Sequence, residues 1–327
     1  MLKTIKQAIK WWKTWGSLPC IYWIRAADNY RSGDYKSAVV NYQKGLEKYL
    51  DHPARFCALM DQSYCLVKLG KIDQAILKLQ TVIKQLPESK EAHIRLANLY
   101  RLIGDDIEAT WLLRKTIKLF PYDSEVLSLF IYSIIDSNAP SHIVIEAREY
   151  LNAIIKIDNN NYLLNTAFHI FDYYYGNKED GRVEISKLAC KLASNLPAKV
   201  YFAKILISEG QFNFARIQLS NALRLYPNNS KILSLLSETY LREIEDRDDT
   251  NLKFSLQLAI SSAQNSYWLS PRELHILAEV YYSFGDKFSA LLVASKAQDI
   301  SKKRSNSYPN QKELESFVSN LASGTLA

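Results

Sequence analysis

The chain has 327 residues, of which 48% are apolar, 12% aromatic and 23% charged. This balance is typical of a packed protein and excludes wholesale disorder. With only 10 glycines and 9 prolines the chain has few helix breakers, so long helices are favoured over a turn-rich β-sandwich. Four cysteines are too few for a disulfide framework in a chain of this length, and they form no CxxC pair, so a reduced, cytosolic chain is favoured.

The positive charge is concentrated in the first third of the sequence. Residues 1–120 carry 20 Lys and Arg against 11 Asp and Glu, whereas residues 121–327 carry 21 against 23. No acidic residue precedes Asp28. A basic end of this kind indicates an acidic partner or an anionic lipid surface, and its alternative is an ordinary solvated face.

Residues 1–18 predict a basic amphipathic helix. At 100° per residue its four lysines fall within an arc of about 80°, beside a face with three tryptophans. This pattern is typical of a helix that lies on an anionic membrane surface. A helix that caps the first repeat and an arm that binds a partner remain as alternatives. The residues concerned are Lys3, Lys6, Lys10, Trp11, Trp12, Lys13 and Trp15.

No transmembrane helix is predicted, because no run of 18 apolar residues occurs. Residues 1–25 do not have the pattern of a cleaved signal peptide, since Lys10 and Lys13 interrupt the position of its apolar region. We therefore expect a cytoplasmic chain, with peripheral attachment to the inner face of a membrane as the alternative.

From residue 19 onward the sequence repeats. A glycine is followed five residues later by alanine, then by apolar or small residues, and in three copies by proline, with a period of 34 residues between the second and third copies. The glycines fit left-handed helix ends, the alanines allow helices to approach closely, and the prolines stop the second helix. The copies begin at Gly33, Gly70, Gly104, Gly210 and Gly285, with alanines at Ala38, Ala75, Ala109, Ala215 and Ala290 and prolines at Pro87, Pro121 and Pro227.

These residues resemble the tetratricopeptide repeat (TPR), a helix–turn–helix of 34 residues. The resemblance implies an all-α fold, a right-handed superhelical solenoid of about eight TPR-like repeats with capping helices at its N- and C-terminal ends. The solenoid is expected over residues 19–302, with irregular stretches at 138–147, 176–182 and 242–252. Pro197 and Pro271 are expected to end two of the weaker repeats, and the charged segment 242–251 is expected to be solvent-exposed.

Residues 303–327 are expected to form a loop and the C-terminal capping helix. The helix is predicted around 311–321 from the apolar stripe of Leu314, Phe317, Val318 and Leu321. The loop is predicted over Ser301–Asn310, with a short basic run at Lys302, Lys303 and Arg304.

In the TPR family the first helix of each repeat lines a concave groove. The resemblance therefore implies that side chains on this face contact a partner. They are Trp23, Tyr30, Met60, Tyr64, Ile94, Asn98, Arg101, Tyr132, Glu238 and Glu279, with Lys204 and His275 on the same face. Members that bind chaperone tails use Lys, Asn and Arg in three successive first helices, and only Asn98 fits that pattern here, which disfavours a chaperone-tail function.

No motif indicates catalysis, a cofactor or a metal. The five histidines have no metal-ligand spacing, and His93 is expected in the core. Cys57 and Cys65, two helical turns apart, are expected to face the core or the groove. The pair Asp105–Asp106 and the pair Asp248–Asp249 lie in turns, where aspartate is common. The leading hypothesis is a non-enzymatic scaffold that binds protein segments in its groove.

Two further hypotheses belong to other classes. One is an adaptor or regulator of envelope or polysaccharide type that docks on a membrane through the N-terminal helix, which liposome flotation would distinguish from a scaffold. The other is an RNA-processing repeat protein, which the acidic balance of residues 121–327 disfavours, so nucleic acid is not expected as a partner.

Overall fold

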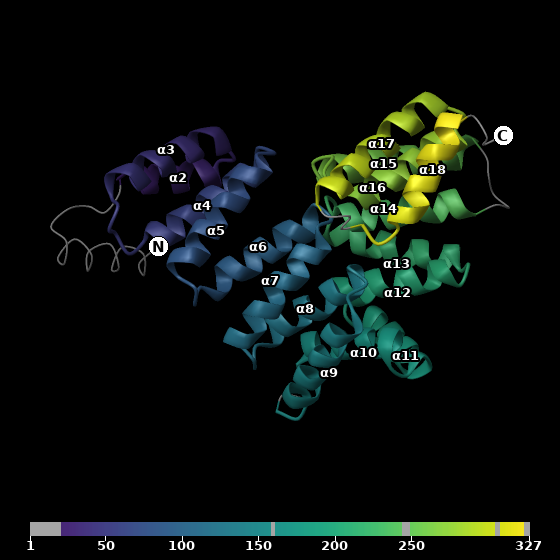
Figure 1. Cartoon of the computed structure of the whole chain (residues 1–327), viewed down its shortest axis with the longest axis horizontal. Helices are drawn as coiled ribbons and strands as arrows, with labels where there is room; N and C mark the ends of the chain where they lie inside the picture. The colour runs from purple at the N-terminus through teal and green to yellow at the C-terminus, as the bar shows by residue number, and fades with distance from the viewer. Residues whose placement is uncertain (1–20, 158–160, 244–248, 305–307, 324–327) are drawn as a thin grey trace. The chain divides into compact units, whose positions relative to one another are not determined.

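The structure is a computed structural model that describes residues 21–157, 161–243, 249–304 and 308–323 (Figure 1). Over these residues the chain forms 17 α-helices and no strand, so the all-α prediction is confirmed. The N-terminal helix predicted over residues 1–18 lies outside the described residues. Among the described helices, none is both long and apolar enough to cross a membrane.

The chain divides into two compact units, residues 1–96 and residues 97–327, and the boundary falls within one helix. The described helices of the first unit, ending with the helix at the boundary, are α2 (Ile21–Arg31), α3 (Tyr35–Lys48), α4 (Arg55–Lys68), α5 (Ile72–Gln85) and α6 (Lys90–Leu102). The second unit continues with α7 (Asp106–Leu119), α8 (Ser124–Asp136), α9 (Ser141–Ile155), α10 (Tyr162–Tyr175), α11 (Lys178–Lys191), α12 (Leu196–Ser208), α13 (Phe212–Leu225), α14 (Ser230–Arg242), α15 (Asp249–Asn265), α16 (Pro271–Ser283), α17 (Lys287–Lys303) and α18 (Gln311–Ser323).

Helices α2 to α17 form eight consecutive helix–turn–helix pairs, as the repeat predicts. All five glycines that open a copy of the repeat have a positive φ, between 72° and 81°, which is the left-handed conformation that ends a first helix. All five alanines of the pattern are fully buried between the two helices of a pair. Each of the three prolines stands two residues after the end of its second helix. The local rules of the repeat therefore determine the local structure.

The first unit is held together by a core between α2, α3, α4 and α5. Trp23 lies in this core, where its Nε1 donates a hydrogen bond to the carbonyl oxygen of Tyr42, 3.4 Å away. A Cβ atom built on Gly45 would come within 2.1 Å of the same indole nitrogen, so α3 needs glycine at this point of close approach.

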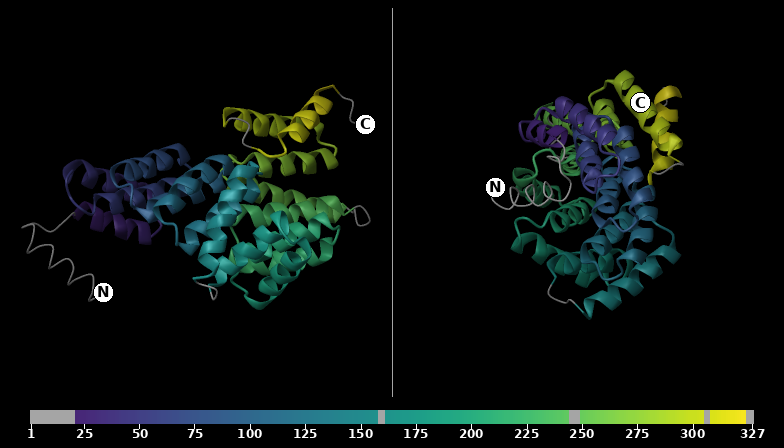
Figure 2. Two further views of the ribbon diagram at one scale, coloured as in Figure 1. Left: turned by 60° about the horizontal axis from the view of Figure 1, so that its bottom comes forward. Right: turned by 90° about the vertical axis from the view of Figure 1, so that its left-hand side faces the viewer.

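In the second unit the last helices share a core to which α18 contributes. Figure 2 shows α18, in yellow, beside these helices. Leu314 of α18 is fully buried in it, and Phe317 and Val318 pack against it. The prediction of an apolar stripe that covers the end of the repeats is confirmed for these three residues.

Several predicted loops are wrong in detail. Residues 178–182 lie in α11, because Asn177 caps this helix with its side chain and the loop before it is only two residues long. Pro197 and Pro271 stand in the first turns of α12 and α16, where proline's missing N–H is not needed, so they begin helices instead of ending repeats. Ser301, Lys302 and Lys303 belong to α17.

The segment 242–251, which was predicted to be solvent-exposed, contains a partly buried residue. Glu243 follows α14 directly and forms an ion pair with Arg216, and both side chains are less than one fifth exposed. Arg304, the last residue of the predicted basic run, is also partly buried. Its Nη1 donates to the carbonyl oxygens of Ile103 and Leu269, at 2.7 and 2.9 Å.

The hydrogen bonds of Arg304 belong to a contact between two parts of the second unit that are far apart in sequence. The turn between α6 and α7 lies against the start of α16, although about 165 residues separate them in sequence. At Gly104 an added Cβ would meet Ser270 Oγ at 2.5 Å and Pro271 Cδ at 3.3 Å. Arg304 Nε lies 3.9 Å from the Asp105 carboxylate on the same turn.

We expect Gly104→Ala to destabilise the chain more than Gly210→Ala. Both glycines have nearly the same positive φ, 72° and 73°, so both variants lose about 1 kcal/mol through backbone strain. A Cβ at Gly210 meets no atom within 4 Å, whereas one at Gly104 collides with Ser270, which adds a further 1–3 kcal/mol, roughly. Urea unfolding of both variants measures the difference. Equal losses would show that the turn is not packed on α16.

Candidate functional site

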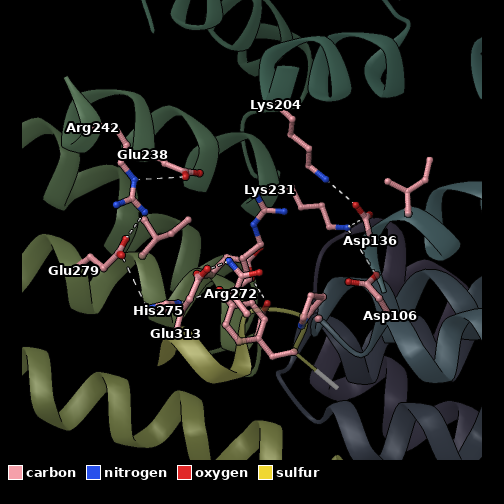
Figure 3. Close-up of a pocket in the computed structure, with 18 of the residues that line it drawn as sticks. Asp106, Asp136, Lys204, Lys231, Glu238, Arg242, Arg272, His275, Glu279 and Glu313 are labelled. Atoms are coloured by element: carbon pink, nitrogen blue, oxygen red, sulfur yellow. Dashed lines mark hydrogen bonds and ion pairs between the residues drawn. The ribbon is translucent and has the colours of Figure 1, made fainter. Parts of the chain in front are cut away.

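The inner side of the second unit is organised around one buried carboxylate. Asp136 is the last residue of α8, and its side chain is only 4% exposed. Three cations from three other helices surround it. Lys204 Nζ of α12 lies 2.6 Å from Oδ1, Lys231 Nζ of α14 lies 2.8 Å from Oδ2, and Arg101 Nη2 of α6 lies 3.4 Å from Oδ2 (Figure 3 shows the two lysines).

A second carboxylate joins this group from the neighbouring turn. Asp106, the first residue of α7, has its Oδ1 3.9 Å from Lys231 Nζ and 4.0 Å from Arg101 Nε. We call Arg101, Asp106, Asp136, Lys204 and Lys231 the central ion cluster. Asp105 and Asp106, which were predicted to lie in a turn, are the N-cap and the first residue of α7, and both are buried.

Burial and charge act in opposite directions on the two carboxylates. Burial alone would raise the pKa of Asp136, but Lys204, Lys231 and Arg101 hold it well below its ordinary value. At Asp106 burial dominates and raises the pKa, although Lys231 lowers it in part. Burial lowers the pKa of Lys204 to about 8 despite the attraction of Asp136. Asp136 is therefore the firmly ionised member on which the cations converge.

Two cavities lie on either side of the central ion cluster, and both have Asp136 and Lys231 in their walls. The first, which we call the apolar cavity, has a volume of about 350 Å³. Its floor is made of aliphatic and aromatic side chains from α6, α8 and α12, and its rim carries amides and Arg101. The floor residues are Leu102, Leu129, Tyr132, Leu196, Pro197, Val200 and Tyr201.

The wall of the apolar cavity is fixed by two tyrosines. Tyr201 OH donates to the carbonyl oxygen of Tyr132 at 3.2 Å, and the two rings lie 5.6 Å apart. Lys204 Nζ lies 4.5 Å from the centre of the Tyr201 ring, a cation–π distance. Burial raises the pKa of both tyrosines, so both stay neutral.

The second cavity, which we call the polar cavity, has a volume of about 270 Å³ and lies between α14, α16 and the segment before α18. On one side, Arg242 Nη2 lies 2.9 Å from Glu279 Oε2 and its Nε lies 3.7 Å from Glu238 Oε1 (Figure 3). His275 lies beside them, with Nδ1 3.0 Å from Tyr308 OH. Burial, and then Arg242, lowers the pKa of His275 to about 4.

The structure brings together five of the ten predicted groove residues at these cavities of the second unit. Arg101 and Tyr132 line the apolar cavity with the exposed Asn98. Glu238 and Glu279 line the polar cavity, where both side chains are about one-fifth exposed and paired with Arg242.

The other predicted groove residues belong to the first unit. Tyr30 and Tyr64 are more than one-third exposed and form an aromatic cluster with Tyr35, with ring centres 5.3–6.5 Å apart. Met60 packs partly buried on the core. Trp23 and Ile94 are buried, so neither presents an exposed side chain. The predicted membrane-surface residues lie outside the described residues, so that expectation stays a prediction.

The sequence pattern did not single out Asp136, Lys231, Arg242, Arg272 or Tyr308. Their partners come from repeats that are far apart in sequence, such as the pair Asp136–Lys231, separated by 95 residues. One signal was present, because Asp136 ends a helix whose preceding residues, 126–135, are almost all apolar or small. A charged residue at such a position requires a buried partner.

The predicted core histidine is confirmed, and of the two cysteines expected in the core or the groove one lies in the core. His93 is 4% exposed, and its Nε2 lies 2.9 Å from the carbonyl oxygen of Pro87. Cys65 is buried, but Cys57 is exposed. Among the described residues, no group of three His, Cys, Asp or Glu side chains is placed to hold a metal ion.

Comparison with solved structures identifies helical-repeat proteins with similar folds. A tetratricopeptide repeat protein from Parabacteroides merdae aligns with a TM-score of 0.50 at 12% identity, over 92% of this chain and 97% of that one. The human IFIT1 dimer with m7Gppp-AAAA aligns with a TM-score of 0.53 at 14% identity, over 86% of this chain and 70% of that one. The APC/C hetero-tetramer Cut9–Hcn1 aligns with a TM-score of 0.51 at 12% identity, over 97% of this chain and 59% of that one.

No protein-family model and no curated protein matches the sequence. At these identities the structural similarity shows the fold alone, and it confirms a TPR-like, all-α helical-repeat fold. The resemblance read from the glycines, alanines and prolines of the sequence is therefore confirmed at the level of the fold.

We expect His275 to make the chain less stable in mild acid. Its pKa is about 4 in the folded chain against an ordinary 6.5, so between these values the unfolded chain binds a proton that the folded chain does not. Stability therefore falls as the pH decreases through this window, by about 3 kcal/mol in full. His275→Gln should reduce the loss of unfolding free energy between pH 7 and pH 4.5, whereas replacing the exposed His142 should not. An unchanged loss in His275→Gln would contradict the assignment.

Proposed function

We propose that the protein is a non-enzymatic scaffold that binds a segment of another protein on the inner side of its second unit. The observation that carries this proposal is the pair of cavities on either side of Asp136, which are lined by first-helix side chains of several repeats. At about 350 and 270 Å³ they have room for side chains and not for a folded domain. An extended segment that places separate side chains in each cavity fits this arrangement.

The apolar cavity is the main anchor in this proposal. Leu129, Val200 and Tyr201 offer apolar surface, and Asn98 and Arg101 at the rim offer hydrogen-bond donors to the backbone of a segment. Buried apolar pockets with a polar rim are where most of the binding free energy of an interface is found. We therefore propose that the partner inserts an aromatic or branched aliphatic side chain here.

A protein partner is favoured over nucleic acid by the charge of the walls. The IFIT1 structure contains m7Gppp-AAAA. Here, however, the polar cavity is lined by six carboxylates, Asp106, Asp136, Glu238, Glu273, Glu279 and Glu313, against four Lys and Arg side chains. A chain of phosphates would be repelled by this lining, since nucleic-acid sites need an excess of Lys and Arg.

We expect Leu129→Trp to abolish or weaken binding of a segment in the apolar cavity, because the larger ring fills part of its volume. The matched control is Val183→Trp, which places the same ring at an exposed position of α11. Peptides are first selected on the full-length protein from a displayed random 12-residue library, and their affinities are then measured by fluorescence anisotropy.

The expected result is an affinity at least about tenfold weaker for Leu129→Trp, which corresponds to 1.4 kcal/mol, and no change for Val183→Trp. Both variants are compared with the wild type in thermal unfolding, so that loss of fold is separated from loss of binding. Selected peptides that bind Leu129→Trp as well as the wild type would show that the apolar cavity is not the anchor.

A further inference from the structure

The polar cavity contains a guanidinium that has no partner in the described chain. Arg272 is the second residue of α16, and its side chain extends into the space between the Arg242 ion pairs and the central ion cluster (Figure 3). It makes no hydrogen bond or ion pair with any residue that the structure describes. Burial opposes its charge, yet Glu238, Glu273 and Asp136 act over longer distances to raise its pKa, so Arg272 remains charged.

The carboxylates on the side of the cavity next to Arg272 already have other partners, since Glu273 accepts a hydrogen bond from Ser270 Oγ. In the central ion cluster, the two carboxylates of Asp106 and Asp136 face three cations. Arg272 adds a fourth. Arg272 is partly buried, and a partly desolvated charge gains from a hydrogen-bonded partner. A carboxylate from outside would supply the two acceptor oxygens that a guanidinium fork binds.

The opposite side of the cavity has an excess of negative charge. Arg242 is shared between Glu238 and Glu279, and Glu313 of α18 lies in the same wall. Burial raises the pKa of Glu279, and the neighbouring Glu238 and Glu313 carboxylates raise it further although Arg242 opposes them. Glu313 is exposed, and it accepts a hydrogen bond from Asn310 Nδ2 at 2.9 Å. The three carboxylates outnumber the one guanidinium of Arg242, so a further cation would be attracted to this side of the cavity.

We propose that the polar cavity binds a dipolar ligand, namely a stretch of the partner segment that carries one acidic and one basic side chain. The acidic carboxylate binds the Arg272 guanidinium, and the basic group lies between Glu279 and Glu313. A simple anion is disfavoured because carboxylates outnumber cations in the lining, and a simple cation would leave Arg272 unpaired. This inference rests on the proposed scaffold function and assigns a chemistry to the partner.

The test uses short peptides as probes of the full-length protein. They are N-acetyl, C-amide peptides with glutamate and lysine separated by zero to three glycines, and matched peptides in which glutamine replaces either charged residue. Affinities are measured from shifts of backbone amide resonances around the cavity. We expect one spacing at which the glutamate–lysine peptide binds about tenfold more tightly than either glutamine peptide.

Two variants separate the two halves of the site. Arg272→Gln should remove the preference for glutamate over glutamine and keep the preference for lysine. Glu313→Gln should weaken the preference for lysine and keep that for glutamate. The controls are Arg224→Gln and Glu149→Gln, which remove exposed charges away from the cavity. Arg272→Lys keeps the charge without the fork and should retain part of the glutamate preference, which serves as the second variant if Arg272→Gln unfolds.

The outcomes distinguish this inference from the scaffold function. Equal affinities for all probes at every spacing, or preferences that do not depend on Arg272, overturn the dipolar site. If the library-selected peptides still bind through the apolar cavity in that case, the scaffold function stands. If the probes show both preferences but no selected peptide depends on either cavity, the dipolar site is supported as a small-ligand site and the scaffold function fails.

Discussion

The inner side of the second unit depends on the ionisation of one buried aspartate. Asp136 ends an apolar helix, so its carboxylate is carried into the protein by the packing of α8. A buried charge is tolerated only with close partners of opposite charge, and Asp136 has three, from α6, α12 and α14. These ion pairs link α8 to three other helices, and Asp136 and Lys231 lie in the walls of both the apolar cavity and the polar cavity.

The local fold was predictable from the sequence because each rule of the repeat acts over a few residues. Gly104 and Gly210 need a left-handed backbone, Ala109 and Ala215 need to be buried, and Pro121 and Pro227 stop helices. The errors were local too. Pro197 and Pro271 were assigned to helix ends, although proline is equally suited to a first turn, and only neighbouring residues such as the capping Asn195 distinguish the two.

The candidate site was much less predictable. A repeat pattern specifies how each helix pair packs on the next pair, but it does not specify which distant repeats meet when the array curves. The contact of Arg304 with Ile103 spans 201 residues, and that of Lys231 with Asp136 spans 95. First-helix periodicity found Arg101, Tyr132, Glu238 and Glu279, because they face the inner side. It described them as parts of an open groove, whereas the structure has two cavities of side-chain size there, with the ion pair of Asp136 and Lys231 in the walls of both.

The central role of Asp136 is tested most directly by the free energy of unfolding of Asp136→Asn, with Asp28→Asn as the control. Asp28 forms an exposed ion pair with Arg31 at 2.9 Å, and loss of such a pair changes stability by about 0–1 kcal/mol. Asp136→Asn leaves Arg101, Lys204 and Lys231 without their main counter-charge, and we predict a loss of about 3–5 kcal/mol in urea unfolding at pH 7. A loss no larger than that of the Asp28 variant would contradict the central role of Asp136.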